Sequence, residues 1–371
     1  MDLVLFGRNQ ANLILMAQYG QARLNAAGWR VRTSRRLESA LASADIVVHQ
    51  IRYGGLEERE KGEYFCQRFG LTADETLGPA ALRTALLSMP GLFRTRDAFE
   101  RVCPRAWLLN LTNPLSAMTA ILAVEPVTTV GLCELPEQTA YEAAEVFGLC
   151  LADIEWEYSG LNHRGFIHRF RLGSRDLLGE LPGALGDRRI GGITGEQIAE
   201  LNALPEKYYP LLLGSLPGSQ GRARYLRSLR RMIIDELRDS AESPPPSLSK
   251  RDLSWYRGAV VPMIRALCGI RPRSLVVNAV RNGLVEETKA TVSGRGVRLM
   301  PVHAPGRKVG ELLAKFQRHE HAFLRAILSP SLETIEEALT EDPTVPETCR
   351  TEVAKALWQD IKLQSSTQES L

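Results

Sequence analysis

The stretch DIVVHQIRYGG, residues 45–55, decides the fold of this chain. Its first part, Asp45 to Ile51, is a β-branched and nearly continuous apolar run, which is typical of a strand buried on both faces of a sheet. Polar residues follow from Gln50 to Gly55, where the strand ends. Because ligands bind beyond the carboxyl ends of parallel strands, this stretch predicts both a sheet and the edge of a site.

Short strands and helices alternate through the first 135 residues. Strands are predicted over residues 2–6, 29–33, 106–111 and 127–132, and helices over residues 10–27 and 35–44. Apolar strands separated by helices predict a parallel sheet covered on both faces. Right-handed crossovers then make a doubly wound, Rossmann-like α/β domain the expected fold.

After about residue 150 this alternation is lost, and the sequence predicts a second α/β domain that is rich in helices. Helices dominate from residue 196 to 267, and one further strand is predicted over residues 275–279. We therefore divide the chain into a nucleotide-binding domain at 1–150, a domain for substrate, metal and oligomerisation at 151–362, and a disordered tail at 363–371.

Length and composition are those of an ordinary two-domain globular protein, with 371 residues, 44% hydrophobic and 24% charged. The net charge is +3 without a dense lysine-arginine block, so no nucleic-acid partner is predicted. The sequence has no signal-peptide pattern and no apolar run of about 18 residues, so we expect a cytoplasmic protein without a membrane partner. Six scattered cysteines without a C-x-x-C pair are expected to be reduced thiols.

Two segments offer donors for a transition metal. Cys133 lies in GLCELP, residues 131–136, and His163 lies in GLNH, residues 160–163. Taken alone, a buried cysteine and a hydrogen-bonded histidine explain these residues equally well. Glu134 is either a general acid or an acid that favours the start of a helix.

Other polar residues leave similar alternatives open. Asn110 and Asn113 either satisfy turn backbones or bind a ligand. Arg52 and Arg251 either hold an anionic group such as a phosphate or are solvated. Tyr208 is either a base or a residue at the edge of a core, and its surroundings favour the core edge.

The order of these segments resembles glycoside hydrolase family 4, the NAD- and divalent-metal-dependent enzymes that include 6-phospho-glucosidases. The stretches that carry the resemblance are QIRYGGLEEREKGE (50–63), ADETLGPAA (73–81), NLTNP (110–114), GLCELP (131–136), GLNH (160–163), KRDLSWY (250–256) and the N-x-x-x-N-G pattern at 278–283. Each motif is weak, but they follow one another in the family's order from about residue 2 to 360.

The resemblance implies a redox route to hydrolysis. In the family, NAD oxidises the sugar 3-hydroxyl, a tyrosine removes the C2 proton, the aglycone leaves by elimination, and water adds before the ketone is reduced. Cys133 and His163 would then hold a divalent metal, with manganese as the expectation, which polarises the carbonyl. Tyr208 would be the catalytic base, and Glu134 would assist the leaving group as in α-specific members.

The resemblance also implies contacts with cofactor and substrate. The residues implied for NAD are Arg8, Gln50 and Asn110, and those implied for substrate are Arg52, Asn113, Asn162 and Arg251. The substrate would be a small sugar or sugar phosphate, with 6-phospho-glucosides as the expectation. Family members are dimers or tetramers, so a homodimer or homotetramer is expected, with a second domain of the lactate/malate dehydrogenase type.

The chain departs from the family in the cofactor half. Its first strand matches the family's second, so the glycine-rich pyrophosphate loop has no counterpart, and the sheet is expected to be incomplete at the N-terminus. Gly7 replaces the acid that would hold the ribose, and Leu211 and Leu212 replace two tyrosines. Two alternatives to a glycosidase therefore stay open, namely an inactive relative that acts as a binding or partner protein, and a sugar oxidoreductase.

Overall fold

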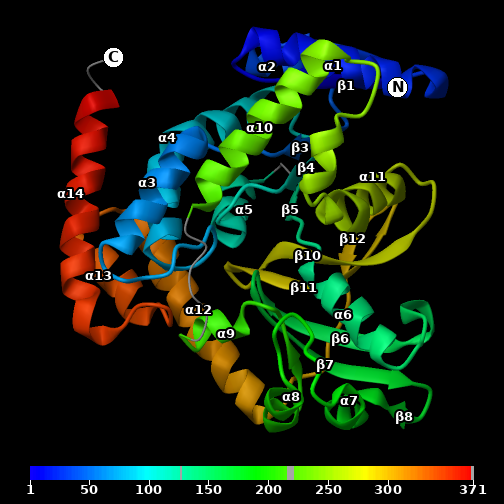
Figure 1. Cartoon of the computed structure of the whole chain (residues 1–371), viewed down its shortest axis with the longest axis vertical. Helices are drawn as coiled ribbons and strands as arrows, with labels where there is room; N and C mark the ends of the chain where they lie inside the picture. The colour runs from blue at the N-terminus through cyan, green and yellow to red at the C-terminus, as the bar shows by residue number, and fades with distance from the viewer. Residues whose placement is uncertain (126–127, 215–220, 369–371) are drawn as a thin grey trace.

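The computed structural model describes residues 1–125, 128–214 and 221–368, and combines one long sheet with flanking helices and a small separate sheet (Figure 1). The strands are β1 (Asp2–Phe6), β2 (Arg30–Ser34), β3 (Ile46–His49), β4 (Trp107–Asn110), β5 (Thr128–Gly131), β6 (Glu155–Leu161), β7 (Arg164–Leu172), β8 (Arg175–Asp176), β9 (Leu204–Pro205), β10 (Arg273–Arg281), β11 (Leu284–Ser293) and β12 (Gly296–Leu299). The α-helices are α1 (Gln10–Leu24), α2 (Leu37–Leu41), α3 (Gly55–Gln67), α4 (Gly78–Val102), α5 (Leu115–Leu122), α6 (Leu135–Val146), α7 (Leu177–Leu185), α8 (Gly195–Leu201), α9 (Tyr209–Leu212), α10 (Arg222–Asp239), α11 (Val261–Leu267), α12 (Arg307–Leu328), α13 (Leu332–Glu341) and α14 (Arg350–Gln368).

The predicted parallel sheet is confirmed in the first part of the chain. β3, β4 and β5 pair in parallel, with Ile46 beside Trp107 and Trp107 beside Thr128. The largest core cluster joins α4 and α5 to the C-terminal helices α12, α13 and α14. Helices from the end of the chain therefore cover the parallel strands from one side (Figure 1).

β1 and β2 form a parallel two-stranded sheet of their own. Neither strand pairs with β3 within the described residues, and Phe6 of β1 and Val48 of β3 each stay 37% exposed. α1 packs on β2, while α2 packs on α4 and attaches this unit to the larger domain. This separation of β1 and β2 from β3 agrees with the sheet that was expected to be incomplete at the N-terminus.

The second half contains far more strand than predicted, and the expectation of a single strand after residue 150 was wrong. β6 and β7 form an antiparallel hairpin, and β10, β11 and β12 form an antiparallel meander. β10 also pairs with β5 through Asn278 and Gly131, which gives the order β3-β4-β5-β10-β11-β6-β7-β8. In β6 the buried and less buried residues alternate, with Glu155, Glu157 and Ser159 on the less buried face, and this alternation is itself typical of a half-buried strand.

The prediction of a disordered tail from residue 363 was wrong over most of its length. α14 continues to Gln368, because no glycine or proline stops it after Arg350. Residues 369–371 lie outside the described residues, as does residue 127 of the predicted strand 127–132. Among the helices that the structure describes, none combines the length and apolar character needed to cross a membrane.

A single row of residues crosses the long sheet and positions the site. We name it the transverse row; from β3 to β7 it comprises His49, Asn110, Gly131, Asn278, Glu287, Gly160 and Gly165. Lateral neighbours in a sheet point to the same face, so these polar side chains lie along one line. Gly165 leaves room for a further side chain on this face, that of Tyr158, because a Cβ at Gly165 would lie 1.8 Å from the Tyr158 hydroxyl oxygen.

We expect Gly165→Ala to lower the free energy of unfolding by about 1–3 kcal/mol, because the added methyl group overpacks against the Tyr158 ring. Chemical denaturation measures this change. Gly183→Ala in α7 is the matched control, since its added methyl group meets nothing within 4 Å. The control should be neutral or slightly stabilising, and equal stability of the two variants would contradict the crowding at Gly165.

Candidate active site

Cys133 lies directly after β5, at the carboxyl end of the parallel strands. Its side chain is 9% exposed and packs against Tyr208. Burial raises the pKa of the Cys133 thiol, and the nearby carboxylates of Glu287 and Glu134 raise it further. The sulfur is therefore protonated in the unliganded protein, and binding of a divalent metal would release its proton.

His163 occupies the tight turn between β6 and β7, where its φ is 62°. Its ring stacks on Tyr208, with the centroids 4.0 Å apart and the planes at 9°. Burial, together with Lys207 and Arg164, lowers the pKa of His163 to about 3, so the imidazole is neutral. Its buried Nδ1 has no hydrogen-bond partner among the described residues, and an unpaired nitrogen on a neutral ring suits a metal ligand.

Tyr208 thus contacts both predicted metal ligands. Across the described ranges, no three or more His, Cys, Asp or Glu side chains are grouped so that they could hold a metal ion. Cys133 and His163 alone would leave coordination positions open to substrate or water, which is the property of a catalytic rather than a structural metal site. A thiolate and an imidazole suit a borderline divalent metal such as zinc, whereas the harder manganese would take its further ligands as oxygen atoms from substrate or water.

Tyr208 is also the residue predicted to be the base. Burial raises the pKa of its phenol far above the usual value, and the charge of Asp74 and the Cys133 sulfur add to the rise. The phenol is therefore protonated at neutral pH. Ionisation requires a nearby cation, and the Lys207 ammonium lies 5.6 Å from the ring centroid.

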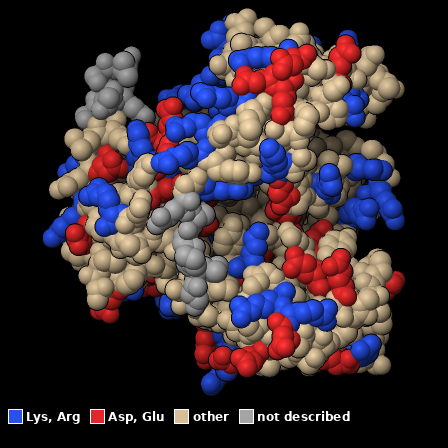
Figure 2. All heavy atoms as spheres, viewed as in Figure 1, with Lys and Arg blue, Asp and Glu red and all other residues tan. Residues whose placement is uncertain are grey.

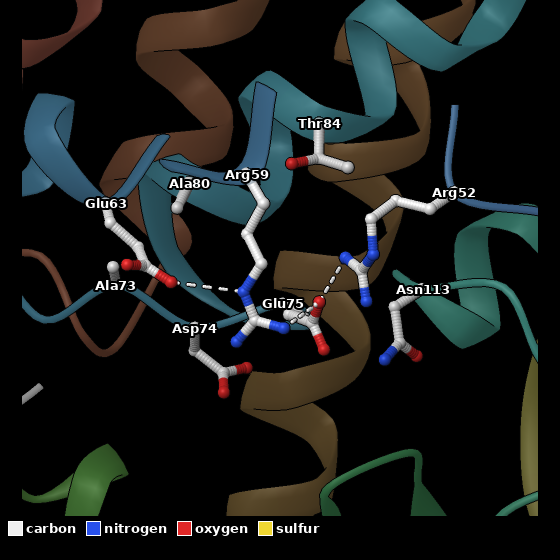
Figure 3. Close-up of a pocket in the computed structure, with 9 residues that line it drawn as sticks. All are labelled: Arg52, Arg59, Glu63, Ala73, Asp74, Glu75, Ala80, Thr84 and Asn113. Atoms are coloured by element: carbon white, nitrogen blue, oxygen red, sulfur yellow. Dashed lines mark hydrogen bonds and ion pairs between the residues drawn. The ribbon is translucent and has the colours of Figure 1, made fainter. Parts of the chain in front are cut away.

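Figure 3 shows a small pocket of paired charges, and two of its carboxyl groups, Asp74 and Glu75, lie near enough to Tyr208 for their charges to affect its pKa. It is lined by Arg52, Arg59, Glu63, Ala73, Asp74, Glu75, Ala80, Thr84 and Asn113. Arg52 and Arg59 both form ion pairs with Glu75, with Arg59 Nη1 2.6 Å from Glu75 Oε1. The enclosed space is about 20 Å³, which is room for one water molecule.

The two carboxyl groups Asp74 and Glu75 in this pocket have pKa values shifted in opposite directions. Burial opposes ionisation of Glu75, but Arg52 and Arg59 outweigh it and lower its pKa. Burial raises the pKa of Asp74 to about 6, although the backbone amides of Thr76 and Leu77 donate to it at 2.7 and 3.0 Å. The pocket therefore presents two arginines that share Glu75 as a counter-ion, and Arg59 is also paired with Glu63.

The predicted substrate residues divide between two places. Arg52 and Asn113 line the pocket, and Arg251 lies near enough to Glu75 and Arg52 for their charges to affect its pKa. Burial lowers the pKa of Arg251, and its guanidinium lies 4.5 Å from the Trp255 ring centroid. Asn162 instead lies fully buried beside the transverse row, next to His163.

Glu134 stands immediately before α6 and beside Cys133. One carboxylate oxygen lies 4.0 Å from the Cys133 sulfur, and the other accepts a hydrogen bond of 3.4 Å from Ser254. Both interpretations of Glu134, helix start and general acid, agree with this position.

The residues predicted to bind a cofactor have less support in the geometry. Arg8 is exposed beyond β1, in the separate sheet. Gln50 is exposed and accepts a hydrogen bond from the Tyr256 hydroxyl. Asn110 is completely buried, and its amide bonds to His49 and Thr119 at 2.9 Å each. Asn110 joins the ends of β3 and β4 to α5, and its contact with a cofactor stays a prediction.

The turn between β1 and α1 does not form a pyrophosphate cradle. Only one glycine, Gly7, precedes α1, and the Asn9 side chain caps the helix by accepting the Asn12 amide at 2.9 Å. A dinucleotide needs free amides and close backbone approach at such a turn. The described N-terminal residues therefore do not fit NAD by themselves.

Two buried carboxyl groups, those of Glu206 and Glu287, were not predicted as site residues from the sequence. Glu287 is completely buried and accepts hydrogen bonds from Tyr158 at 2.5 Å, Asn278 at 2.7 Å and Asn162 at 3.2 Å. Glu206 is 2% exposed, and neither of its carboxylate oxygens has a hydrogen-bond partner among the described residues. An acid inside an otherwise β-rich stretch, LVEETKATV, was the available signal for Glu287.

Glu206 and Glu287 compete for one negative charge. Burial raises the pKa of both carboxyl groups, and Glu287 raises that of Glu206 further. Hydrogen bonds from Tyr158, Asn278 and Asn162 oppose the rise at Glu287. Glu206 is therefore the group that keeps the proton.

Fold and site together define a class of protein, an α/β chain whose parallel strand ends carry a buried thiol and an arginine pocket, with an imidazole supplied by the turn of an antiparallel hairpin. A model of family 4 glycosyl hydrolases matches residues 6–149, and a model of the C-terminal domain of that family matches residues 158–345. The chain belongs to glycosyl hydrolase family 4. The family resemblance found in the sequence is thereby confirmed.

Individual relatives agree with this assignment. The chain is 26% identical over 337 residues to a probable 6-phospho-beta-glucosidase of Bacillus subtilis, covering 83% of this chain and 76% of the relative. It is 24% identical over 362 residues to a 6-phospho-alpha-glucosidase of Leptotrichia buccalis, covering 87% and 81%. The 6-phospho-beta glucosidase of Thermotoga maritima, solved with manganese, NAD+ and glucose-6-phosphate, superposes with a TM-score of 0.85 at 21% identity, over 98% of this chain and 91% of that one. This last likeness confirms the predicted two-part α/β fold.

We expect Glu206→Gln to raise the stability of the protein at neutral and alkaline pH. In the unfolded chain Glu206 ionises near its usual pKa of 4.5, whereas in the folded protein it keeps its proton to a higher pH. Between these two pKa values the folded state binds the extra proton, so stability falls by up to about 1.4 kcal/mol per pH unit as pH rises. The variant removes this loss.

Thermal unfolding across pH 5 to 9 measures the effect. Glu196→Gln, at an exposed position in α8, is the control and should follow the wild-type profile. A Glu206→Gln profile that is parallel to the wild type would show that Glu206 is ionised in the folded protein.

Proposed function

We propose that this protein hydrolyses O-glycosidic bonds of 6-phospho-glucosides. Family 4 membership and the names of the similar proteins support the reaction and the phosphorylated substrate. The observation that carries the proposal is the position of Tyr208. It stacks on the unpaired imidazole of His163, packs against Cys133, and lies near enough to Asp74 and Glu75 of the arginine pocket for their charges to affect its pKa.

Each residue has a role that follows from its surroundings. Cys133 and His163 would hold the divalent metal, which would supply Lewis-acid polarisation of a sugar oxygen. Tyr208 lies against both ligands and would accept a proton from the sugar as a phenolate, once a cation bound beside it had lowered the pKa of its phenol. Glu134 lies beside Cys133, is held by Ser254, and is the group placed to protonate the leaving oxygen.

The pocket provides the charge for the phosphate. A guanidinium group binds phosphate through parallel hydrogen bonds; Arg52 and Arg59 line the pocket, and Arg251 lies near enough for its charge to act on Glu75. A phosphate entering this pocket would replace Glu75 as the counter-ion of the first two arginines. Asn113, on the same wall, would add an amide donor.

NAD is the second cofactor that we propose, on the support of the relative solved with NAD+. The capped start of α1 gives this chain no matching cradle within the described residues. The same observation favours a second candidate function, a binding relative without turnover. Leu211 and Leu212, which replace two tyrosines of the family, are buried in the core and contribute no hydroxyl group.

The setting of the protein follows from the same proposal. Six free cysteines agree with a reducing, cytoplasmic location. Acidic and basic side chains are interspersed over the face shown in Figure 2, and a lack of nucleic-acid binding stays a prediction. The homodimer or homotetramer expected from the family also stays a prediction.

Release of an aryl alcohol from α- and β-linked aryl 6-phospho-glucosides tests the function. We expect release only when manganese and NAD are both present, and none from the unphosphorylated glucosides. No release, together with no NAD-dependent shift of the melting temperature, would favour the binding relative. NADH formation from a non-hydrolysable analogue without release would identify an oxidoreductase.

We expect Cys133→Ser to weaken manganese binding at least about tenfold, because an alcohol stays protonated where a thiol can ionise onto the metal. Titration calorimetry at constant pH measures the affinity without reference to activity. Cys150→Ser, which changes an exposed thiol, should bind like the wild type. Equal affinity of the two variants would refute the ligand assignment.

A further inference from the structure

Glu287 is the centre of a buried polar cluster that the proposed reaction leaves unexplained. It lies in β11, with Asn278 of β10 directly opposite on one side and Gly160 of β6 directly opposite on the other. One carboxylate oxygen, Oε1, accepts both the Asn278 amide at 2.7 Å and the Asn162 amide at 3.2 Å. The other oxygen accepts the Tyr158 hydroxyl at 2.5 Å.

One of these donors lies in the turn that carries His163, and another lies opposite the strand that leads to Cys133. Asn278 pairs with Gly131, which is two residues before Cys133. Asn162 directly precedes His163 in the turn between β6 and β7. One oxygen atom of Glu287 therefore joins the His163 turn to the strand that lies against the Cys133 segment.

Close packing leaves these segments little freedom to move. A Cβ at Gly131 would lie 2.6 Å from Thr119 Oγ1 and 3.0 Å from the Cβ of Asn278, so β5 and β10 meet without a gap. The His163 turn is held on one side by the Asn162 amide, which donates to Glu287, and on the other by the buried guanidinium of Arg164. Asn162 Oδ1 and His163 Nδ1 have no hydrogen-bond partner among the described residues, so the Asn162 amide is one of the anchors of this turn.

We propose that Glu287 is a positioning residue that fixes the distance between Cys133 and His163 by accepting the amides of Asn278 and Asn162. The inference rests on the proposed metal site. Glu287 is completely buried and does not line the pocket, so it acts through its neighbours rather than by touching substrate. Groups that orient metal ligands from behind typically change metal affinity about 10- to 100-fold when they are removed.

The oxygen rather than the charge of Glu287 is what the geometry requires. Glutamine at this position retains an oxygen that can accept both asparagine amides, and its own amide can donate to the Tyr158 oxygen. Leucine has a similar size but accepts nothing, so both asparagine amides would lose their acceptor. The two substitutions therefore separate positioning from electrostatics.

The test is manganese binding, with manganese alone as the probe, to Glu287→Gln, Glu287→Leu and Asn278→Ala. We expect Glu287→Gln to bind within about threefold of the wild type, and Glu287→Leu to bind about 10- to 100-fold more weakly. Asn278→Ala removes only the hydrogen bond between Glu287 and β10, and it should also weaken manganese binding. This variant therefore tests the proposal even if Glu287→Leu does not fold. Glu236→Gln is the control, because that carboxylate accepts two hydrogen bonds from Ser247 but lies in α10.

A second measurement reports on the turn without the metal. Amide hydrogen exchange over residues 160–166 should be faster in Glu287→Leu and Asn278→Ala than in the wild type, and unchanged in Glu236→Gln. Folded Glu287→Leu with wild-type affinity and wild-type exchange would overturn the inference while leaving the metal site standing. If Glu287→Gln bound manganese as weakly as Glu287→Leu, the inference would be overturned in favour of a charge effect. If the wild type bound no manganese, both the metal site and the inference would be refuted.

Discussion

The pairing of Asn278 with Gly131 is the contact on which the rest of the structure depends. It joins β10 to β5, and so connects the parallel strands of the first part of the chain to the antiparallel strands of the second. Only glycine fits at position 131, where a side chain would collide with Thr119 of α5. This one register places Cys133 and the β6–β7 turn at the same edge of the sheet, which neither part of the chain could do alone.

The site combines two halves with opposite electrostatic character. Around Cys133 and His163, burial keeps the thiol protonated and the imidazole neutral, and two carboxyl groups lie nearby. In the pocket, arginines are held ionised against Glu75. The first half suits a cation and the second an anion, and Tyr208 lies where they meet. A ligand that carries a phosphate at one end and metal-binding hydroxyls at the other matches this polarity.

The sequence predicted those features that depend on short stretches. The strand at Ile46–His49 was evident from its β-branched residues, and the proposed metal ligands, Cys133 and His163, were named from motifs in a fixed order. The roles of Glu287 and Asn110 depend on register instead. Glu287 meets its Tyr158 partner across 129 residues of chain, and Asn110 meets His49 across 61. No local pattern encodes such pairs. β10 and its neighbour β5 are likewise far apart in the sequence, so the insertion of β10 beside β5 was not predicted.

The long sheet has a mechanical consequence. Many two-domain enzymes close over their substrates by bending at a connector between domains. Here the hydrogen-bonded strands run from β3 to β8, so bending between the two parts would break the pairing of Asn278 with Gly131 at the β5–β10 seam. Adaptation to a ligand is therefore confined to side chains and to loops at the rim, such as the exchange of Glu75 for a phosphate. A ligand held at the strand ends would accordingly stiffen both parts of the molecule at once, and they would melt as a single cooperative unit.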